Sequence, residues 1–272
     1  MAKRDRRTTA KKIERRLKEG RGQGTGAEYR PWLQIQDVPS LGLAHRILGL
    51  KTKRIHHFLS NQELRCFLMF EWMDEVIDIR EQYPLLPLLE TQSIAVNLGV
   101  KHPADPRSRE PIVMTTDFLV TFVHDGRQEL LAFAVKASRD LYNPRVKEKL
   151  EIERRYWEKH AVRWEAITEL QIPAVFVANL DIIRPKYDLS TYCDVPADDI
   201  RDIAHMVSSA MQKQALSLRA AAAACDRQLG YPRGTSLAVA YHLLATKQWR
   251  IDMRVPLDPS RPLNLLATNK QS

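Results

Sequence analysis

The sequence predicts an α/β protein, with a mixed domain built around a β-hairpin and a helical domain after it. Apolar runs at 115–123 and 128–136 flank the dipeptide Asp125-Gly126, which is a strong hairpin signal. Beyond residue 196 apolar residues recur at helical spacing over three successive segments. With 272 residues, of which 44% are apolar, the chain is long enough for one large domain or two smaller ones.

In the mixed domain, expected over 27–180, strands and helices alternate. Ser60 and Glu63 have the spacing of a capping box, and Asn143-Pro144 supplies a cap and a first helical residue. The expected elements are a helix over 60–73, a strand over 76–79, the two hairpin strands, a helix over 143–160 and a strand over 162–167. Together they form an α/β core with a hairpin at its centre.

The second domain, expected over 181–255, is helical. We expect helices over 198–213, 215–229 and 235–246, followed by a strand over 249–255. Three helices and a strand are typical of a winged helix-turn-helix, and an ordinary helical subdomain fits the same pattern. Under the first interpretation three basic residues would lie near DNA phosphates, and under the second they form a solvated rim: Arg233, Lys247 and Arg250. Residues 256–272 predict an extended tail.

Positive charge is concentrated at the N-terminus. The formal net charge is +9, and residues 1–21 contribute +7 of it through ten basic and three acidic side chains. The glycines at 20, 22, 24 and 26 then predict a flexible hinge, so residues 1–26 form a basic arm and a hinge. Such an arm suits the phosphate backbone of nucleic acid, and a solubilising tail is the alternative. The DNA-binding candidates in the arm are Lys3, Arg4, Arg6, Arg7, Lys11 and Lys12.

Several classes of protein are not expected. No run of about 18 apolar residues is present, so no membrane span is predicted. The charged N-terminus has no apolar stretch behind it, so we expect no secretory signal. Three cysteines, at positions 66, 193 and 225, give neither a disulfide framework nor paired metal ligands. These features favour a protein of the reducing cytoplasm.

Three charged residues are candidates for catalysis: Glu63, Asp117 and Lys136. Asp117 lies within an apolar strand, where a carboxylate is costly unless a cation or a donor meets it. A two-residue loop at Asp125-Gly126 sets Asp117 opposite Ala134, with Lys136 diagonal to it, whereas a four-residue loop sets Asp117 opposite Lys136. Either register keeps the carboxylate and the ammonium within reach of one ligand, and a slip by one residue separates them.

Two carboxylates and a lysine in this arrangement suit phosphodiester hydrolysis. Carboxylates hold Mg²⁺, which polarises the phosphate and activates water, while lysine stabilises charge in the transition state. Structural interpretations compete with this one, because Glu63 completes a capping box and Asp117 with Lys136 forms an ordinary cross-strand salt bridge. His56 and His57 are adjacent on a strand and point to opposite faces, so they predict no shared zinc site.

The sequence resembles the TnsA family over residues 19–160. The segments that carry the resemblance follow one another in order: Glu19-Gly20-Arg21-Gly22-Gln23-Gly24, Pro31-Trp32-Leu33, His56-His57-Phe58-Leu59-Ser60, Asp78-Ile79-Arg80-Glu81-Gln82-Tyr83-Pro84, Thr116-Asp117-Phe118-Leu119-Val120, Val135-Lys136 and Glu153-Arg154-Arg155-Tyr156-Trp157. From residue 180 onward the resemblance is weaker and lies mostly in pattern.

Members of this family are the endonuclease subunit of a heteromeric cut-and-paste transposase. The resemblance therefore implies a restriction-endonuclease-like core, with a mixed sheet and central hairpin flanked by helices, followed by a winged-helix domain. It implies cleavage of the 5′ ends of a transposon, with double-stranded DNA at those ends as substrate. The implied partners are a TnsB-type DDE transposase, which cuts and joins the 3′ ends, and a TnsC-type AAA+ ATPase. The implied place of action is the nucleoid in the bacterial cytoplasm.

The resemblance also assigns the site. The family's catalytic residues fall on Glu63, Asp117 and Lys136. The implied metal is Mg²⁺, with Mn²⁺ as a substitute, held by Glu63, Asp117 and Val135. A family metal-site glutamine falls on Ala134, so one ligand must come from water, the Val135 carbonyl or a nearby acid such as Glu153. This departure keeps open a catalytically weakened subunit that binds DNA and recruits the regulator, and a stand-alone nuclease is a third interpretation.

Overall fold

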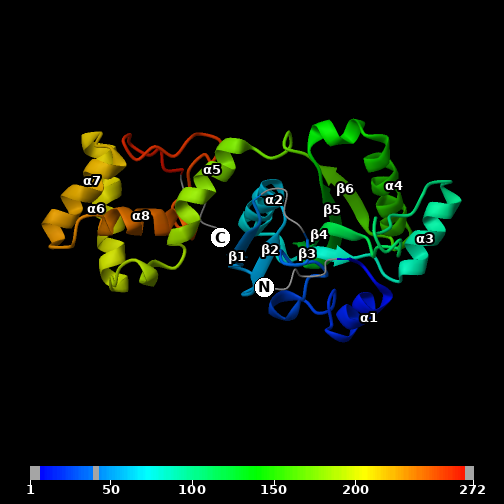
Figure 1. Ribbon diagram of the computed structural model, residues 1–272. Helices are drawn as coiled ribbons and strands as arrows, with labels where there is room; N and C mark the ends of the chain where they lie inside the picture. Colours follow the sequence, from blue (N-terminus) through cyan, green and yellow to red (C-terminus); the bar gives the residue numbers. More distant parts are fainter. Residues whose placement is uncertain (1–6, 39–42, 267–272) are drawn as a thin grey trace. The chain divides into compact units, whose positions relative to one another are not determined.

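The computed structural model describes residues 7–38 and 43–266 and consists of two compact units, Met1–Ile172 and Pro173–Ser272 (Figure 1). We predicted a domain boundary after residue 180, which lies inside helix α5 (Ala174–Ile183). Pro173 is the N-cap of that helix, so the second unit begins where the helix does. In the described ranges no helix is long and apolar enough to cross a membrane.

A four-stranded mixed sheet forms the centre of the first unit. In sheet order its strands are β3 (Val76–Pro84), β4 (Thr115–His124), β5 (Arg127–Val135) and β6 (Arg163–Ile167). The first three strands are antiparallel neighbours, and β6 runs parallel to β5. The predicted hairpin is therefore confirmed as the β4–β5 pair at the centre of the sheet. A separate two-stranded sheet pairs β1 (His45–Leu48) with β2 (Ile55–Phe58).

Helices cover both faces of this sheet (Figure 1). The helices of the first unit are α1 (Ala10–Lys18), α2 (Asn61–Trp72), α3 (Leu88–Asn97) and α4 (Pro144–Lys159), with 3-10 turns at Gly26–Glu28 and Ser138–Tyr142. Both predicted helix starts are confirmed, because Ser60 caps α2 and the Asn143 side chain accepts from the Arg145 N–H at 2.8 Å. Helix α4 makes the crossover that a parallel β5–β6 pair requires.

Alternate residues of the central strands pack against different helices. On one face Phe118 and Phe133 contact Phe70 of α2, with ring centroids 5.5 and 4.9 Å away. On the other face Leu119 and Ala132 pack with Ile152 and Trp157 of α4 and with α3. Burying one such large apolar side chain is worth roughly 1.5–3 kcal/mol, so these two layers fix the sheet between the helices.

The described part of the N-terminal segment packs onto the first unit. The Thr8 N–H donates to Asp105 Oδ2 at 2.7 Å, which ties the start of α1 to a distant loop. Within α1, Arg16 is buried, lies over the Trp32 ring at 5.5 Å and pairs with Asp37 at 3.5 Å. Part of the positive charge that we assigned to a free arm is therefore used inside the protein.

The glycine-rich segment is a packed turn, which corrects the prediction of a flexible hinge. Gly22 has a φ of +80°, and its N–H donates to the Arg30 carbonyl at 2.6 Å. A Cβ atom on Gly22 would lie 2.2 Å from Cγ of Pro84. A left-handed backbone and a close neighbour both require glycine, and composition alone does not distinguish this requirement from a linker.

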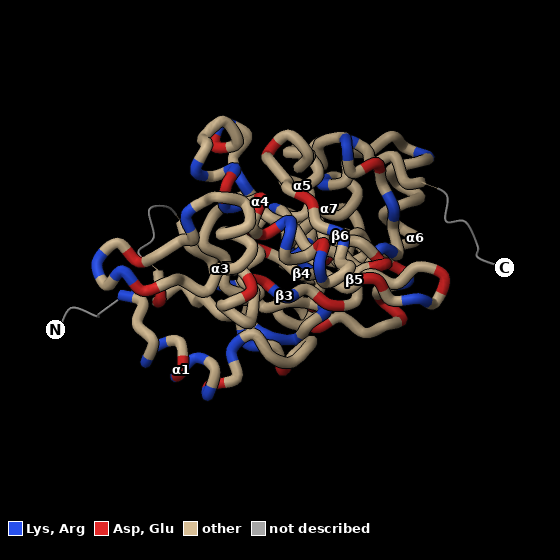
Figure 2. The backbone as a smooth tube through the Cα atoms, turned by 90° about the vertical axis from the view of Figure 1, so that its right-hand side faces the viewer, with Lys and Arg blue, Asp and Glu red and all other residues tan. Residues whose placement is uncertain are grey.

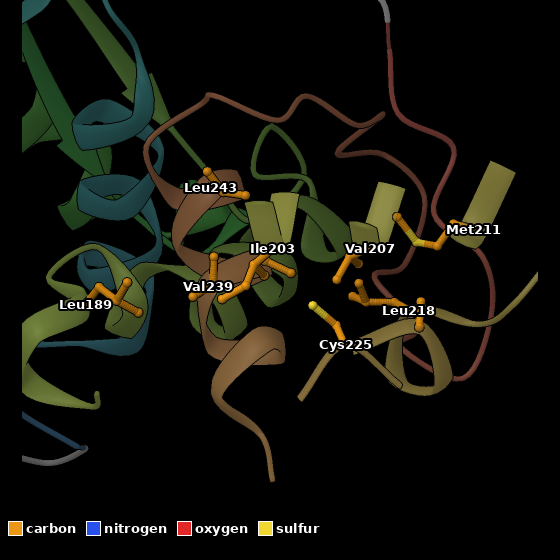
Figure 3. Close-up of a cluster of buried hydrophobic side chains, with 10 residues drawn as sticks. Leu189, Ile203, Val207, Met211, Leu218, Cys225, Val239 and Leu243 are labelled. Atoms are coloured by element: carbon orange, nitrogen blue, oxygen red, sulfur yellow. The ribbon is translucent and has the colours of Figure 1, made fainter. Parts of the chain in front are cut away.

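The second unit is helical in the part of it that the structure describes. It contains α5, α6 (Ala197–Gln214), α7 (Leu218–Leu229) and α8 (Thr235–Ala245), with 3-10 turns at Arg184–Lys186 and Leu189–Thr191. The three helices predicted beyond residue 196 are confirmed. Their apolar faces meet in one core, which includes Ile203, Val207, Leu218, Val239 and Leu243 (Figure 3).

Residues 249–255 do not form the predicted strand. The Trp249 N–H donates to the Leu243 carbonyl at 2.9 Å and so closes the end of α8. The Asn179 side-chain amide donates to the carbonyls of Met253 and Val255 at 3.0 and 2.8 Å. These backbone groups bind to α8 and α5 instead of to a neighbouring strand. No strand is present anywhere between Pro173 and residue 266. The winged-helix prediction is not confirmed.

Candidate active site

The three predicted catalytic residues lie at one end of the four-stranded sheet. Asp117 is near the start of β4, and Lys136 follows the last residue of β5. Because these strands are antiparallel, the start of one lies beside the end of the other. Glu63 comes from the first turn of α2, the helix that packs on this sheet. Glu63, Asp117 and Lys136 are far apart in the sequence and therefore meet only through the fold, at one end of the sheet.

The hairpin register brings Asp117 and Lys136 together. His124 pairs with Arg127, so the loop has two residues, and the same register sets Asp117 opposite Ala134. Lys136 Nζ lies 2.7 Å from Asp117 Oδ2, and the Val135 N–H donates to the same oxygen at 2.7 Å. Lys136 Nζ also donates to the Val135 carbonyl at 2.9 Å. The sequence left two hairpin registers open, and the structure has the one that belongs to a two-residue loop.

Glu63 caps its helix and also faces the site. The Ser60 hydroxyl accepts from the Glu63 N–H at 3.2 Å, as the predicted capping box requires. The Glu63 carboxylate reaches back to the start of the helix, where it accepts from the Leu59 N–H at 2.9 Å and from the Ser60 hydroxyl at 3.0 Å. The side chain is buried, and burial together with Asp117 raises the pKa of Glu63 to about 7. The cap fixes where this carboxylate points, so its structural role and a catalytic role are compatible.

Gln82 is a site residue that the sequence analysis did not identify. Its Nε2 lies 3.4 Å from Glu63 Oε2 and 3.4 Å from Asp117 Oδ1. Its Oε1 accepts from the Thr115 hydroxyl at 3.1 Å. The side chain is only 2% exposed, and its φ is +50°. Only the pairing of β3 with β4 brings Gln82 to this place, and the sequence gives no local signal for that pairing.

Lys136 is held as a cation by the acids around it. Burial alone would lower its pKa, but Asp117, Glu153 and Glu63 outweigh that effect and raise it. The charged ammonium of Lys136 therefore lies beside the Asp117 carboxylate, directly after the last residue of β5. An ammonium group in this position can neutralise charge that develops on a phosphate.

Glu153, one candidate for the oxygen that Ala134 lacks, lies near Asp117 and Lys136 and is hydrogen-bonded to other residues. It lies on α4, is buried, and its Oε1 accepts from Thr116 Oγ1 at 2.8 Å and from Trp164 Nε1 at 3.0 Å. Burial and Asp117 raise the pKa of Glu153 to about 7. Within residues 7–38 and 43–266 no group of three or more His, Cys, Asp or Glu residues has the geometry of a metal site. Ala134 is fully buried.

A second buried ionic cluster lies next to the site on β3. Glu81 is fully buried and is paired with Arg54, at 2.8 Å from Nη1, and with His56, at 2.8 Å from Nδ1. Burial would raise the pKa of Glu81, but His56 and Arg54 outweigh it and lower that pKa to about 2. This cluster joins β2 to β3, so the role of His56 is structural.

The predicted DNA-binding residues fall into three sets. Lys3, Arg4 and Arg6 lie outside the described residues. Basic positions follow one another along α1 and just before it (Figure 2), where Arg7 and Lys11 are exposed and Lys12 donates to the Arg7 carbonyl at 3.4 Å. In the second unit Arg233 precedes α8, whereas Lys247 and Arg250 follow it. Eleven helical residues span about 16 Å, so α8 separates Arg233 from the other two.

The sheet and the residues at its end define the class of protein. A four-stranded mixed sheet has a central antiparallel hairpin, a parallel strand added by a helical crossover, and an Asp-Lys pair where the hairpin strands begin and end. This arrangement, with helices on both faces, fits a restriction-endonuclease-like core.

Comparison with known proteins agrees with this class. Residues 73–169 match the family model of the TnsA-like endonuclease N terminal region, and residues 171–253 match that of the TnsA endonuclease C terminal region. The chain is also 48% identical over 169 residues to the transposon Tn7 transposition protein TnsA of Escherichia coli, a match that covers 62% of this chain and 60% of that protein. The chain therefore belongs to the TnsA endonuclease family. Asp117 and Lys136 lie inside the first matched region, whereas Glu63 precedes it.

Proposed function

We propose that this chain is a Mg²⁺-dependent DNA endonuclease that cleaves the 5′ ends of a transposon during cut-and-paste transposition. The observation that carries the proposal is the 2.7 Å pair of Lys136 and Asp117 beside the buried Glu63 carboxylate. Membership of the TnsA family supports the same activity. Mn²⁺ is the expected substitute for Mg²⁺.

The donor atoms at the site suit a hard divalent cation. The carboxylates of Glu63 and Asp117 converge on one amide nitrogen, which lies 3.4 Å from an oxygen of each. A cation at this end of the sheet would be held by these two carboxylates and by the Val135 carbonyl, since oxygen atoms are its preferred ligands. When bound, it supplies electrophilic assistance to the phosphate and a more acidic water.

The chain's own residues perform the remaining tasks. The Lys136 ammonium, which its acidic neighbours keep protonated, faces the same end of the sheet and stabilises negative charge on the reacting phosphate. The capping contacts from Leu59 and Ser60 hold the Glu63 carboxylate in one orientation. The Val135 N–H fixes Asp117 Oδ2 at 2.7 Å. The site is thus oriented before substrate arrives.

The proposed partners follow from the family. Double-stranded DNA at transposon ends is the substrate, a TnsB-type DDE transposase processes the 3′ ends, and a TnsC-type AAA+ ATPase couples both to target choice. The name of the Escherichia coli relative describes a transposition protein, which supports this setting. We place the activity at the nucleoid in the bacterial cytoplasm.

Strand-specific nicking of a transposon-end substrate, with the partner transposase present, tests the proposal. Removing a single charge-stabilising donor costs about 10²–10³-fold in rate, so Lys136→Met should lose about that much. Lys101→Met removes an exposed lysine from a loop and is the matched control. Full activity of Lys136→Met, or of Asp117→Asn, would exclude the proposed site.

A catalytically weakened subunit that binds DNA and recruits the regulator is the second candidate function. The observation in its favour is Ala134, which is fully buried and has no side-chain oxygen where the family has a glutamine. Wild-type protein that binds transposon ends but cuts them with neither Mg²⁺ nor Mn²⁺, with the partner present, would favour this candidate.

A further inference from the structure

We propose that Gln82 supplies the neutral oxygen ligand that Ala134 cannot, by turning its side-chain amide from the two carboxylates to a bound divalent cation. This inference rests on the proposed metal-dependent function and adds a residue to its site. The amide nitrogen of Gln82 lies between Glu63 and Asp117, at 3.4 Å from a carboxylate oxygen of each. A cation placed between those carboxylates would displace an N–H donor and favour an oxygen there.

Gln82 and Ala134 are related by the sheet. The β3–β4 register that pairs Glu81 with Phe118 and Tyr83 with Thr116 sets Gln82 opposite Asp117. The β4–β5 register sets Ala134 opposite Asp117 from the other side. Asp117 therefore has one polar neighbour across the sheet, Gln82, and one neighbour without any polar side-chain atom.

The backbone turns Gln82 towards the carboxylates. In a regular strand Glu81 and Gln82 would point to opposite faces. Glu81 nevertheless contacts His56 of β2, and Gln82 contacts Glu63 of the helix that follows β2, so both side chains lie on the α2 side of the sheet. The φ of +50° at Gln82 is the break in the alternation that permits this. The Gln82 carbonyl accepts from the Trp32 N–H at 3.1 Å, which holds the break in place.

The surroundings of the amide accommodate both of its orientations. A side-chain amide has one acceptor end and one donor end of nearly equal shape. With Nε2 towards the carboxylates, Oε1 accepts from the Thr115 hydroxyl at 3.1 Å. After a half-turn Nε2 would face Thr115, whose hydroxyl also accepts, and Oε1 would face the cation. Both states keep the amide hydrogen-bonded, although the side chain is 2% exposed.

A glutamate at position 82 separates a ligand from a simple hydrogen-bond donor. Gln82→Glu keeps an oxygen for a cation but has no N–H for the carboxylates, whereas Gln82→Met has neither at similar length. Gln82→Asn is too short to reach the site, but asparagine adopts the left-handed backbone conformation well. A loss of Mn²⁺ affinity in this variant therefore cannot be attributed to a folding defect. Gln128→Met changes an exposed glutamine of β5 and is the matched control.

The experiment measures the rise of the melting temperature with Mn²⁺ concentration in the absence of DNA, alongside nicking of transposon ends. We expect Gln82→Met and Gln82→Asn to weaken the apparent Mn²⁺ affinity by about 10–100-fold, the range typical of residues that support a metal site. Gln82→Glu and Gln128→Met should retain it. Nicking by Gln82→Met should recover as Mn²⁺ is raised.

The outcomes separate this inference from the proposed function. If wild type gains stability from Mn²⁺ and Gln82→Met gains the same at every concentration, the ligand role is wrong and the nuclease proposal stands. If Gln82→Glu loses the Mn²⁺ response as Gln82→Met does, Gln82 acts only as a donor and the inference is again wrong. If wild type neither responds to Mn²⁺ nor nicks DNA, the proposed function and the inference are overturned together.

Discussion

Neutralising Asp37 should destabilise the first unit strongly, because this carboxylate pairs with the buried guanidinium group of Arg16 and the partly buried one of Arg21. The Asp37 side chain is 4% exposed and lies 2.5 Å from Arg21 Nη1 and 3.5 Å from Arg16 Nη2. Although burial opposes it, these arginines lower the pKa of Asp37, so it is ionised at neutral pH. Asp37→Asn preserves the shape of the side chain and removes the charge.

The magnitude follows from the partners left behind. Removing one member of a buried ion pair costs about 3–5 kcal/mol, because the remaining charge is uncompensated. For a protein unit of this size, 1 kcal/mol shifts the melting temperature by about 2–4 °C, so the expected fall is about 6–20 °C. Arg16→Met in the Asp37→Asn background should recover part of the loss, since it removes one of the unpaired charges.

Urea unfolding and thermal melting measure these effects. Glu14→Gln breaks the pair of Glu14 with Lys18, whose side chains are 62% and 75% exposed, and an exposed pair is worth less than about 1 kcal/mol. This variant is therefore the control. Asp37→Asn with the stability of Glu14→Gln would mean that the N-terminal segment is not held as the structure describes, and a free basic arm would return as the better description.

Three further predictions concern stability. The pKa of Glu81 is about 2, against an ordinary value of 4.5, so its ionisation contributes about 3 kcal/mol to the free energy of unfolding. Because the pKa is lowered in the folded state, this contribution is fully present above pH 4.5 and is lost as the pH falls towards 2. The difference in stability between wild type and Glu81→Gln should therefore close between pH 4.5 and pH 2. Asp226→Asn should cost about 1.5–3 kcal/mol in urea unfolding, because the buried carboxylate accepts from the N–H groups of Gly234 and Ser236 at 2.7 Å each; an unchanged midpoint would contradict this. Gly22→Ala should cost about 2–4 kcal/mol, from its backbone and from the 2.2 Å approach to Pro84, whereas Gly126→Ala, with open space around it, should cost about half as much; equal losses would refute the steric argument.

Helices and the hairpin were predictable because their signals are local. The capping residues Ser60 and Asn143 lie within one turn of the groups they bind. Asp125-Gly126 fixes a hairpin, and the hairpin fixes Asp117 near Lys136, so two of the three catalytic candidates needed no knowledge of the rest of the fold. Glu63 was a candidate from the sequence as well, but its local pattern indicates a helix cap equally well, so the resemblance to the TnsA family was needed to favour the catalytic role.

Local pattern misled where a residue's role depends on distant partners. The strand predicted over 249–255 is apolar enough, but Asn179 binds its carbonyls from another helix. The glycines at 22 and 24 have the composition of a linker, yet Pro84 and Glu28 leave no room for a side chain. Basic residues near the N-terminus resemble a free polycation, yet Arg16 and Arg21 neutralise a buried carboxylate.

The sequence by itself determined the α/β class, the hairpin, the three later helices and the pairing of Asp117 with Lys136, because helix periodicity, caps and tight turns act over a few residues. Only the tertiary structure decided which basic residues of the N-terminal segment form ion pairs with buried acids. It also decided which side chains contact Glu63 and Asp117. Gln82 reaches them because β3 pairs with β4 in a register that no local signal specifies. Contacts of this kind depend on the packing of whole strands and helices. For this reason the tertiary structure, and not the local sequence, decides which residues make up the site.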